Sequence, residues 1–411
     1  MILLDNPVQD KIVEEGINWF KYSSDQIFEI DGEAGTGKTV TLWRIINGLN
    51  LKPYEIMPMA YTGQASIVMR TRGFTNARSI HSSLYHIVRK PLEYEVGKDD
   101  PFHIMDMTLN KKNYTFEFKP YEVGELPSYI KLMVVDEGWM VPKRMVYDIL
   151  RHGIKVLVAG DCGQLPPIGD DPGFLTSSRV HHLTQIMRQQ AGNPIIYLAH
   201  RARYNEPIHC GVYGNNAIVI EDKDLTNDMV LNIGNIICGT NKTRDSVNTN
   251  VRNLLNLPDH PVYGDRVICK NNNWDNVMGD IALTNGLTGF ISSPVNVNNF
   301  HYRNKNLFEM DFKPDLLNES FKSLQVNYEY IMSDYAERNK IKNNRFAKYE
   351  IGELFEYAYA LTTHSAQGSE YISGIFIEEF LRPEIQSQLI YTGITRFKRN
   401  LIYVKRTRRY Y

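Results

Sequence analysis

The residue types most able to do chemistry lie together in a glycine-rich stretch near the start of the chain. It reads Asp31-Gly32-Glu33-Ala34-Gly35-Thr36-Gly37-Lys38-Thr39, follows an apolar strand pattern at 27–30 and precedes a helix-compatible run at 40–49. Glycines let the backbone curl so that N–H groups point at phosphate oxygens, and the helix N-terminus adds partial positive charge. We expect Lys38 to reach the β- and γ-phosphates of a nucleoside triphosphate and Thr39 to ligate Mg²⁺.

Two further strand patterns end in polar residues. The buried run 131–135 ends in Asp136 and Glu137. In a phosphate-loop protein such a strand usually delivers the Asp to the Mg²⁺ shell and the Glu to the attacking water. A second apolar run, 154–159, leads into the block 160–167, where Gln164 could orient a water or sense the γ-phosphate. Taken alone, that block also fits an ordinary glycine- and proline-rich loop.

Two single residues give weaker signals. Gln9 begins a helical pattern over 7–22, just upstream of the glycine-rich stretch, and a glutamine amide can pair with the N6 and N7 edge of adenine. Arg188 follows the second polar strand end and could face the same site. By themselves, an isolated glutamine and an isolated arginine are more often surface residues.

The bulk composition limits the class of protein. A chain of 411 residues should hold two or more domains. Its net charge of −1 gives no global basic signature, so nucleic-acid binding would need a local groove. The four cysteines show no zinc spacing, which favours free thiols in a reducing compartment. The N-terminus does not fit a signal peptide, and no apolar run approaches membrane-spanning length.

Two regions differ in character from the rest and predict insertions. The region 91–126 mixes aromatic and charged residues, and near-alternation over 113–119 indicates a β-hairpin arm. The region 296–350 is rich in Asn, Lys, Tyr and Phe, and we expect it to be partly helical around 324–335. The range 358–370 returns to a strand, a polar loop and a helix start, and the block 389–396 is a helix-like run that ends at Arg396.

Together these blocks, in this order, resemble the superfamily 1 helicases, and within them the 5′-to-3′ branch of RecD-like and phage Dda-like enzymes. The resemblance implies an α/β fold of two RecA-like phosphate-loop domains, with a β-hairpin pin in the first and a small accessory domain in the second. The implied domain limits are, for the first domain, 1–90 and 127–200 around the pin at 91–126, and for the second, 201–295 and 351–411 around the accessory domain at 296–350.

The resemblance also implies roles for single residues. ATP would lie in the cleft between the domains, in contact with Gln9 and the stretch Gly32 to Thr39. Gly368 and Glu370 would contact it from the second domain. Two arginine fingers would act on the γ-phosphate, Arg188 and Arg396. The positions at which the family grips the single strand are Thr62, Ser79, His81, Asn241, Thr362 and His364.

Two positions depart from the family pattern. Gly138 and Trp139 follow the paired carboxylates, where a small residue is usual, so Trp139 is expected to pack locally or to stack on a base. Ser365 replaces the basic residue that usually follows the late-block histidine, which weakens a phosphate contact there.

The leading hypothesis is an ATP- and Mg²⁺-dependent single-stranded DNA translocase and helicase that moves 5′ to 3′. Its implied setting is phage or mobile-element DNA replication, recombination or repair in the bacterial cytoplasm. Its partners would be single-stranded DNA, the DNA fork and replication proteins such as a single-strand-binding protein, with no membrane, and it would act as a monomer. Two alternatives remain: a superfamily 1 viral RNA helicase, and a nucleic-acid-dependent ATPase that clamps without unwinding.

Overall fold

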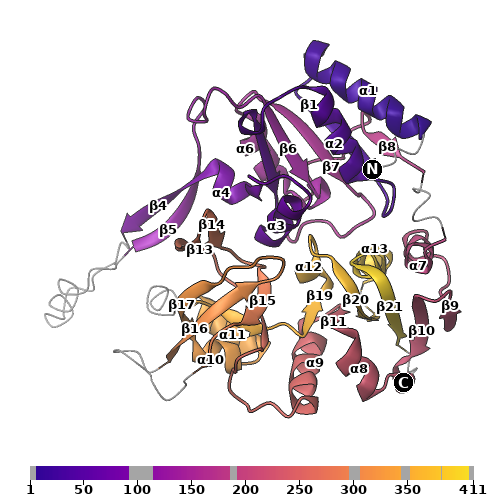
Figure 1. The fold of residues 1–411 in the computed structure, drawn as a ribbon, viewed down its shortest axis with the longest axis vertical. Coiled ribbons are helices and arrows are strands. Elements are labelled where there is room, and N and C mark those ends of the chain that lie inside the picture. The colour runs from indigo at the N-terminus through magenta and orange to yellow at the C-terminus, as the bar shows by residue number, and fades with distance from the viewer. Residues whose placement is uncertain are drawn as a thin grey trace, which may run out of the picture.

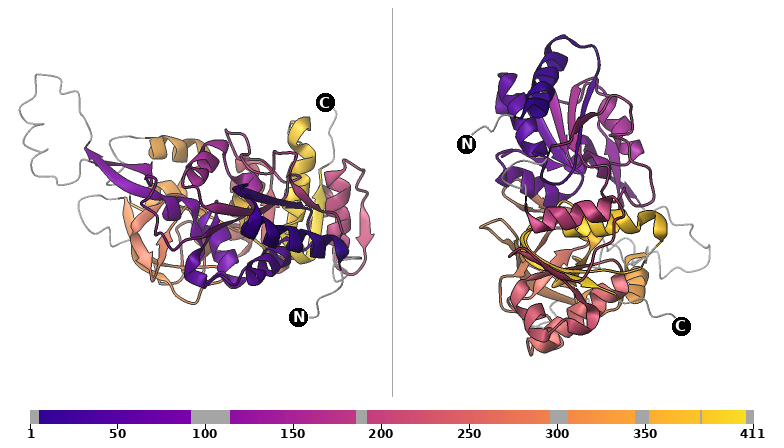
Figure 2. Two further views of the ribbon diagram at one scale, coloured as in Figure 1. Left: turned by 90° about the horizontal axis from the view of Figure 1, so that it is seen from above. Right: turned by 90° about the vertical axis from the view of Figure 1, so that its right-hand side faces the viewer.

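The structure is a computed structural model, and it describes residues 6–91, 114–185, 192–295, 306–343, 352–380 and 382–406. Two α/β halves lie one above the other, and a smaller β-rich unit lies beside the second half (Figures 1 and 2). In the described ranges, no helix is both long enough and apolar enough to cross a bilayer. All four cysteines are free thiols.

The first half is built on a six-stranded parallel sheet in the order β3-β2-β6-β7-β1-β8. Its central strands β6 and β7 are mainly apolar because helices cover both faces: α1, α2 and α3 on one side, α4 and α6 on the other. The strands are β1 Ile27–Gly32, β2 Ile56–Ala60, β3 Arg78–Ser79, β6 Leu132–Asp136, β7 Lys155–Gly160 and β8 His181–Leu183. The helices are α1 Pro7–Tyr22, α2 Lys38–Gly48, α3 Gly63–Thr71, α4 Ile80–Leu84 and α6 Lys143–Leu150.

The second half repeats this plan with a sheet in the order β19-β11-β20-β21-β10-β9, of which only the edge strand β9 is antiparallel. Helices α7 and α13 cover the face toward the first half, and α8 and α9 cover the opposite face (Figure 2). The strands are β9 Gly211–Tyr213, β10 Ala217–Glu221, β11 Asn235–Cys238, β19 Ala360–Thr362, β20 Tyr371–Ile377 and β21 Phe397–Lys405. The helices are α7 Pro194–Arg203, α8 Asn227–Ile233, α9 Asn241–Leu254, α12 Thr363–Ala366 and α13 Pro383–Ile394.

A five-stranded antiparallel sheet, β17-β16-β15-β12-β18, forms the accessory unit. Alternate residues of β16 are buried, which packs Phe308, Met310 and Phe312 into one core. The strands are β12 Arg266–Cys269, β15 Thr288–Ile291, β16 Leu307–Pro314, β17 Phe321–Asn327 and β18 Phe355–Tyr357. The remaining elements are the hairpin β13 Asn273–Met278 and β14 Ile281–Leu283 and the helices α10 Tyr328–Met332 and α11 Tyr335–Asn343.

Strand pairing moves the limits of this unit outward from the predicted 296–350. Strands β12 and β15 lie before residue 296 and β18 lies after residue 350, yet all three belong to the accessory sheet. Short strands with glycine turns look alike in either domain, so the sequence pattern could not assign them. The run 324–335 also differs from expectation, since it is a strand to Asn327 and becomes helical at Tyr328.

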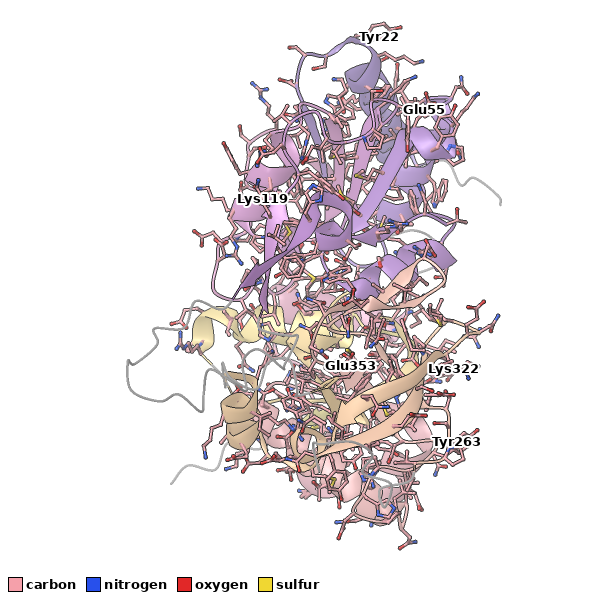
Figure 3. The ribbon with its side chains drawn as sticks, turned by 90° about the vertical axis from the view of Figure 1, so that its left-hand side faces the viewer. Tyr22, Glu55, Lys119, Tyr263, Lys322 and Glu353 are labelled. Carbon is pink, nitrogen blue, oxygen red and sulfur yellow. The ribbon has the colours of Figure 1, made fainter. Side chains whose placement is uncertain are left out.

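The predicted hairpin arm begins earlier than residue 91. Its strands β4 Tyr85–Pro91 and β5 Tyr114–Pro120 pair in antiparallel fashion, with Tyr85 opposite Pro120, and project from the first half (Figure 1). The span 92–113 lies outside the described residues. Figure 3 shows Lys119 on this hairpin, with Glu353 and Lys322 in the accessory unit below it.

Candidate active site

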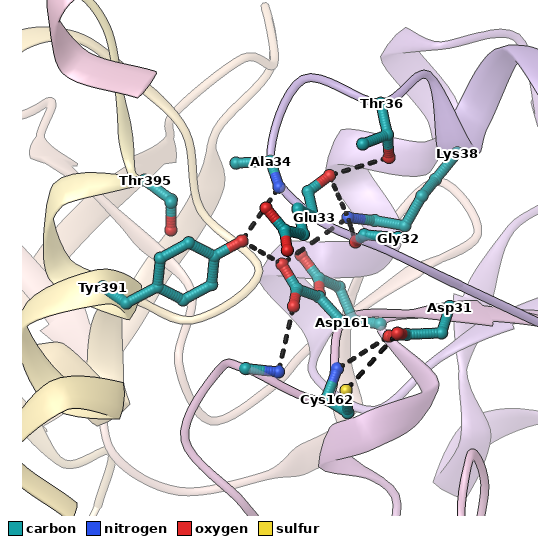
Figure 4. Close-up of polar contacts among 12 residues, drawn as sticks. Asp31, Gly32, Glu33, Ala34, Thr36, Lys38, Asp161, Cys162, Tyr391 and Thr395 are labelled. Atoms are coloured by element: carbon teal, nitrogen blue, oxygen red, sulfur yellow. Dashed lines mark hydrogen bonds and ion pairs between the residues drawn. The ribbon is translucent and has the colours of Figure 1, made fainter. Parts of the chain in front are cut away.

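The glycine-rich stretch forms a tight loop between β1 and α2. Gly35 and Gly37 have φ values of 83° and 86°, a conformation that favours glycine. A Cβ on Gly32 would lie 2.5 Å from the Thr36 hydroxyl, so the backbone could not close as it does with a larger residue. Lys38 Nζ donates to the carbonyls of Gly32 (2.5 Å) and Glu33 (3.3 Å) within this loop (Figure 4). The loop therefore has the curled backbone and central ammonium that phosphate binding needs.

Gln9 lies against the end of this loop. The Asn6 side chain caps α1 by accepting from the Gln9 backbone N–H, which fixes the start of the helix. The buried Gln9 amide donates to Thr41 Oγ1 (2.9 Å) and to the Gly37 carbonyl (3.3 Å). The structure thus places Gln9 against the glycine-rich loop, although 28 residues separate it from Gly37.

Asp136 and Glu137 lie at the end of β6, at the same edge of the sheet. Parallel pairing places Asp136 beside Ala60 at the end of β2. Glu137 adopts a left-handed conformation (φ 54°, ψ 41°) that turns the chain sharply after the strand. Burial raises the pKa of Asp136, while the nearby Arg72 guanidinium acts to lower it. Two carboxylates in succession at this edge give the site its acidic groups.

The contacts of Arg72 indicate that Thr39 and Asp136 can hold a cation. One of its nitrogens donates to Thr39 Oγ1 (2.9 Å) and lies 3.5 Å from Asp136 Oδ2. A hydroxyl and a carboxylate that converge on one positive group form a hard oxygen donor pair, which suits Mg²⁺. In the described part of the chain, no group of three or more His, Cys, Asp or Glu side chains could hold a metal, so phosphate oxygens or water would complete the coordination.

Asp161, at the end of β7, is the centre of a buried ionic network (Figure 4). Its carboxylate pairs with Arg203 of α7, accepts a hydrogen bond from the Tyr391 hydroxyl (2.5 Å) and lies 3.8 Å from Lys38 Nζ. The Tyr391 hydroxyl also accepts from the Ala34 backbone N–H (2.9 Å). A second-half tyrosine therefore contacts the phosphate loop directly.

Gln164 is buried at this interface, and its Oε1 has no hydrogen-bond partner among the described residues. A buried amide oxygen without a partner is costly, so a water or ligand atom would stabilise it. Its backbone carbonyl accepts from the Trp139 indole N–H (3.0 Å), so Trp139 packs locally, one of the two predicted uses. Next to it, Leu165 N–H donates to Thr392 Oγ1 and Leu165 O accepts from Gln367, which joins the two halves.

The second half presents cations to the acidic edge. Arg396 is 5% exposed, donates to the Thr392 carbonyl (3.2 Å) and lies 3.6 Å from Glu137. Glu370 pairs with Arg72 and with Lys398 (2.6 Å); burial acts to raise its pKa, but Arg72 and Lys398 outweigh burial and lower it. A cavity of about 40 Å³ lies between the halves, lined by Ala65, Val68, Arg72, Asp136, Glu137, Gly368, Glu370, Thr395 and Arg396.

Arg188 and Gly368 were also predicted to contact the nucleotide. Arg188 lies outside the described residues. Gly368 packs beside α3, where an added Cβ would lie 2.7 Å from Ala65 Cβ and 3.2 Å from Thr62 Oγ1. Its place is therefore at the contact between the halves, next to a residue predicted to grip DNA.

The residues predicted to grip nucleic acid lie mostly at the starts of helices. Thr62, Ser79 and Thr362 each cap a helix by accepting a backbone N–H, from Ala65, Ser82 and Ser365 respectively. Asn241 is the first residue of α9, whose cap is Thr240. Capping therefore explains part of their chemistry without DNA.

Burial favours the neutral form of the two histidines of this set. Burial lowers the pKa of His81, with a further contribution from the positive charge of Arg144. Burial alone lowers the pKa of His364. Any contact that they make to a nucleic acid would rest on hydrogen bonding or stacking, because the charged form is disfavoured.

The hairpin arm contacts the accessory unit through aromatic rings. Phe118 of β5 packs against His81 (5.2 Å between ring centroids) and edge-on against Trp274 of β13 (6.1 Å). Glu353 accepts from three asparagines at the base of the β13–β14 hairpin: Asn271, Asn273 and Asn276. The arm thus packs against the β13–β14 hairpin, which lies before the predicted accessory range.

Sequence reasoning did not identify three residues that form this site, Arg72, Arg203 and Tyr391 as a cross-domain ligand, nor Trp274 at the hairpin arm. Asp161 gave an indirect signal, because a carboxylate at the end of a buried strand needs a positive partner. Nothing in the local sequence around Arg203 identifies it as that partner.

Comparison with protein families matches residues 7–222 to the AAA domain family. The ATP-dependent RecD2 DNA helicase of Deinococcus radiodurans is 25% identical over 299 residues, which cover 66% of this chain and 36% of that helicase. The chain therefore spans little more than a third of the length of this curated relative.

Solved Pif1 helicases share the fold. A structure on DNA unwinding at forked duplexes by two coordinating Pif1 helicases aligns with a TM-score of 0.56 at 16% identity, over 98% of this chain and 92% of that one. Bacteroides Pif1 bound to single-stranded DNA aligns with a TM-score of 0.53, also at 16% identity and with the same coverage. These likenesses confirm the predicted fold of two RecA-like domains.

Proposed function

We propose that this chain, which belongs to the AAA domain family, hydrolyses ATP to move along single-stranded DNA and to open duplex DNA from 5′ to 3′. The observation that carries the proposal is the contact of Arg396 with Glu137 across the two halves, 3.6 Å apart. A cation from one half beside the acidic edge of the other can act on a phosphate only when the halves approach. Hydrolysis is thereby tied to domain motion.

In the nucleotide site, Lys38 and the loop amides would hold the phosphates, and Gln9 would lie next to the base. Thr39 and Asp136 would hold Mg²⁺, which neutralises phosphate charge. Glu137, at the end of the same strand, would take a proton from the attacking water, and the buried Gln164 amide oxygen would orient that water. Arg396 would stabilise the charge that develops on the γ-phosphate.

Domain motion is needed in this scheme. The cavity of about 40 Å³ between the halves is far smaller than the roughly 300–1,000 Å³ of typical ligand pockets, and its lining includes no residue of the phosphate loop. We propose that the halves separate to admit a nucleotide and close again for hydrolysis. Tyr391, Thr392 and Gln367 cross the interface with hydrogen bonds, and these would break and re-form in each cycle.

The nucleic acid would lie across both halves. Helix starts capped by Thr62 and Ser79 in the first half and by Thr362 in the second offer N–H groups to a phosphate backbone. The solved structures support DNA as the substrate, since Bacteroides Pif1 is bound to single-stranded DNA in one and two Pif1 helicases unwind forked duplex DNA in the other. The hairpin arm, which packs on Trp274, would serve as the pin that separates the strands.

The proposal is tested by unwinding assays on duplexes with either a 5′ or a 3′ single-stranded tail. We expect ATP-dependent unwinding of the 5′-tailed DNA alone, and loss of it in Lys38→Ala. Unwinding of 3′-tailed DNA alone would refute the direction. The same assay on an RNA duplex tests the RNA helicase alternative, because preferential unwinding of RNA would favour that alternative.

Displacement of streptavidin from the end of a biotinylated oligonucleotide tests translocation separately. A passive ATPase clamp binds the strand and hydrolyses ATP but leaves streptavidin in place. Because a single chain supplies both faces of the nucleotide site, we propose that the monomer is the active form. Sedimentation of the DNA-bound protein checks this, and a dimer as the sole active species would contradict it.

A further inference from the structure

Arg72 holds a position that neither the sequence motifs nor the proposed reaction explains. It is the C-cap of α3, and its guanidinium contacts Thr39 Oγ1 at 2.9 Å and Asp136 Oδ2 at 3.5 Å. Its other terminal nitrogen pairs with Glu370 of the second half. One side chain thus joins the phosphate-loop helix, the acidic strand end and the opposite half.

The backbone around Arg72 is held in place from the same helix that follows the phosphate loop. The Trp43 indole N–H of α2 donates to the Arg72 carbonyl (2.9 Å). The next residue, Gly73, has a φ of 105° and lies so close to Trp43 that a Cβ would be 2.9 Å from the ring. The guanidinium is therefore directed at the site by a fixed helix end.

Thr39 and Asp136 are the two groups assigned above to Mg²⁺, so this step rests on the proposed function. Mg²⁺ binds oxygen at roughly 2.0–2.1 Å and in near-ideal octahedral geometry. A guanidinium that is hydrogen-bonded to the same hydroxyl and paired with the same carboxylate cannot stay there when the metal binds. Two positive groups at one pair of oxygens would also repel each other.

We propose that the Arg72 guanidinium competes with Mg²⁺ for Thr39 and Asp136, and that this competition sets the magnesium concentration at which the protein binds nucleotide. The guanidinium neutralises the acidic edge when the metal is scarce. Because Arg72 also pairs with Glu370, the same competition links metal binding to a contact between the halves. Arg72 thus acts on the site through Thr39 and Asp136 and does not itself bind the nucleotide.

The chain offers a matched control two residues earlier on the same helix. Arg70 makes a two-pronged ion pair with Asp280 (2.9 and 2.8 Å) and donates to the Ala77 carbonyl. It therefore also joins α3 to another part of the chain. No contact of Arg70 in the described residues reaches Thr39 or Asp136.

The test measures binding of a fluorescent ATP analogue to the full chain by anisotropy, across a titration of magnesium chloride. We expect Arg72→Met to lower the magnesium concentration for half-maximal binding about tenfold, the effect of removing one charged hydrogen bond. Arg70→Met should stay within about twofold of the parent. Arg72→Lys keeps the positive charge but cannot contact two groups at once. Its magnesium concentration for half-maximal binding should lie between those of the other two variants. Thermal melting of each variant shows that it is folded.

The outcomes separate this inference from the proposed function. If the parent binds the analogue in a Lys38-dependent manner but Arg72→Met leaves the magnesium requirement unchanged or raises it, the competition is refuted and the ATPase proposal stands. If the parent shows no Lys38-dependent binding at all, the proposed function fails first. Equal shifts in Arg72→Met and Arg70→Met would show a general loosening of α3 and would refute a specific role for Arg72.

Discussion

The two six-stranded sheets have the same plan but contribute different chemistry. The ends of β1, β6 and β7 in the first half carry the phosphate loop, Asp136 and Asp161. The second half reaches the site mainly through α13 and the residues after it, with the Tyr391 hydroxyl and the Arg396 guanidinium. The shared architecture therefore does not decide function.

The two halves of the molecule therefore have different roles at the site. The first half holds the acids, the ammonium and the curled backbone, and so contains what is needed to bind phosphate and metal. The second half supplies groups that act only by approaching it. On this view, damage to the first half should abolish binding, whereas damage to the second should spare binding and abolish turnover.

The largest effect is expected for Lys38→Ala in the first half. Loss of the ammonium removes the charge that the loop directs at the phosphates, so DNA-stimulated ATP hydrolysis should fall by more than about 100-fold, and nucleotide binding should weaken. Phosphate release measures the first and analogue anisotropy the second. Lys11→Ala, an exposed lysine on α1 that pairs with Glu15, is the control. Unchanged turnover in Lys38→Ala would show that the phosphate loop of the first half takes no part in ATP hydrolysis.

Arg396→Ala tests the second half. Because the guanidinium approaches from across the cleft, we expect hydrolysis to fall about 1,000-fold while nucleotide affinity changes little. Arg399→Ala, an exposed arginine three residues later, should behave like the parent. If Arg396→Ala lost binding as completely as Lys38→Ala, the proposed division between the halves would be wrong.

Tyr391→Phe tests the link between the halves. It removes one hydroxyl that accepts from Ala34 and donates to Asp161, and it keeps the buried ring. Loss of these buried bonds should lower the melting temperature by about 2–6 °C. The matched control is Tyr197→Phe, because Tyr197 is half exposed and its hydroxyl accepts only from Arg201 among the described residues. Equal melting of both variants would mean that the contact adds no stability.

The smallest effect concerns His81 and His364, one from each half. Burial lowers the pKa of both, so the unfolded chain takes up protons below pH 6.5 that the folded chain does not, and stability falls as the pH drops from 7.5 to 5.5. His81→Gln and His364→Gln should each reduce that loss, by up to about 1 kcal/mol. Urea unfolding at both pH values measures it. A loss unchanged in both variants would contradict the shifts.

The sequence predicted the parts of the fold and site that depend on neighbouring residues. The helix at Pro7–Tyr22 follows from an Asn cap, a proline at its first turn and apolar spacing. The phosphate loop follows from glycines at fixed spacing between a strand and a helix. Strand ends at Asp136 and Gly160 follow from buried apolar runs. In contrast, the accessory unit was placed too narrowly, because β12 and β18 pair although almost 90 residues separate them.

The sequence by itself therefore determined that the chain has a phosphate loop, paired carboxylates and a late arginine block, because each is written in a few consecutive residues. Only the tertiary structure decided which polar and charged groups meet. Ala34 and Tyr391 are 357 residues apart, and Arg72 and Glu370 are 298 apart. Such pairs depend on the path of the whole chain and on the burial that makes an unpaired charge costly, and neither is encoded in local spacing.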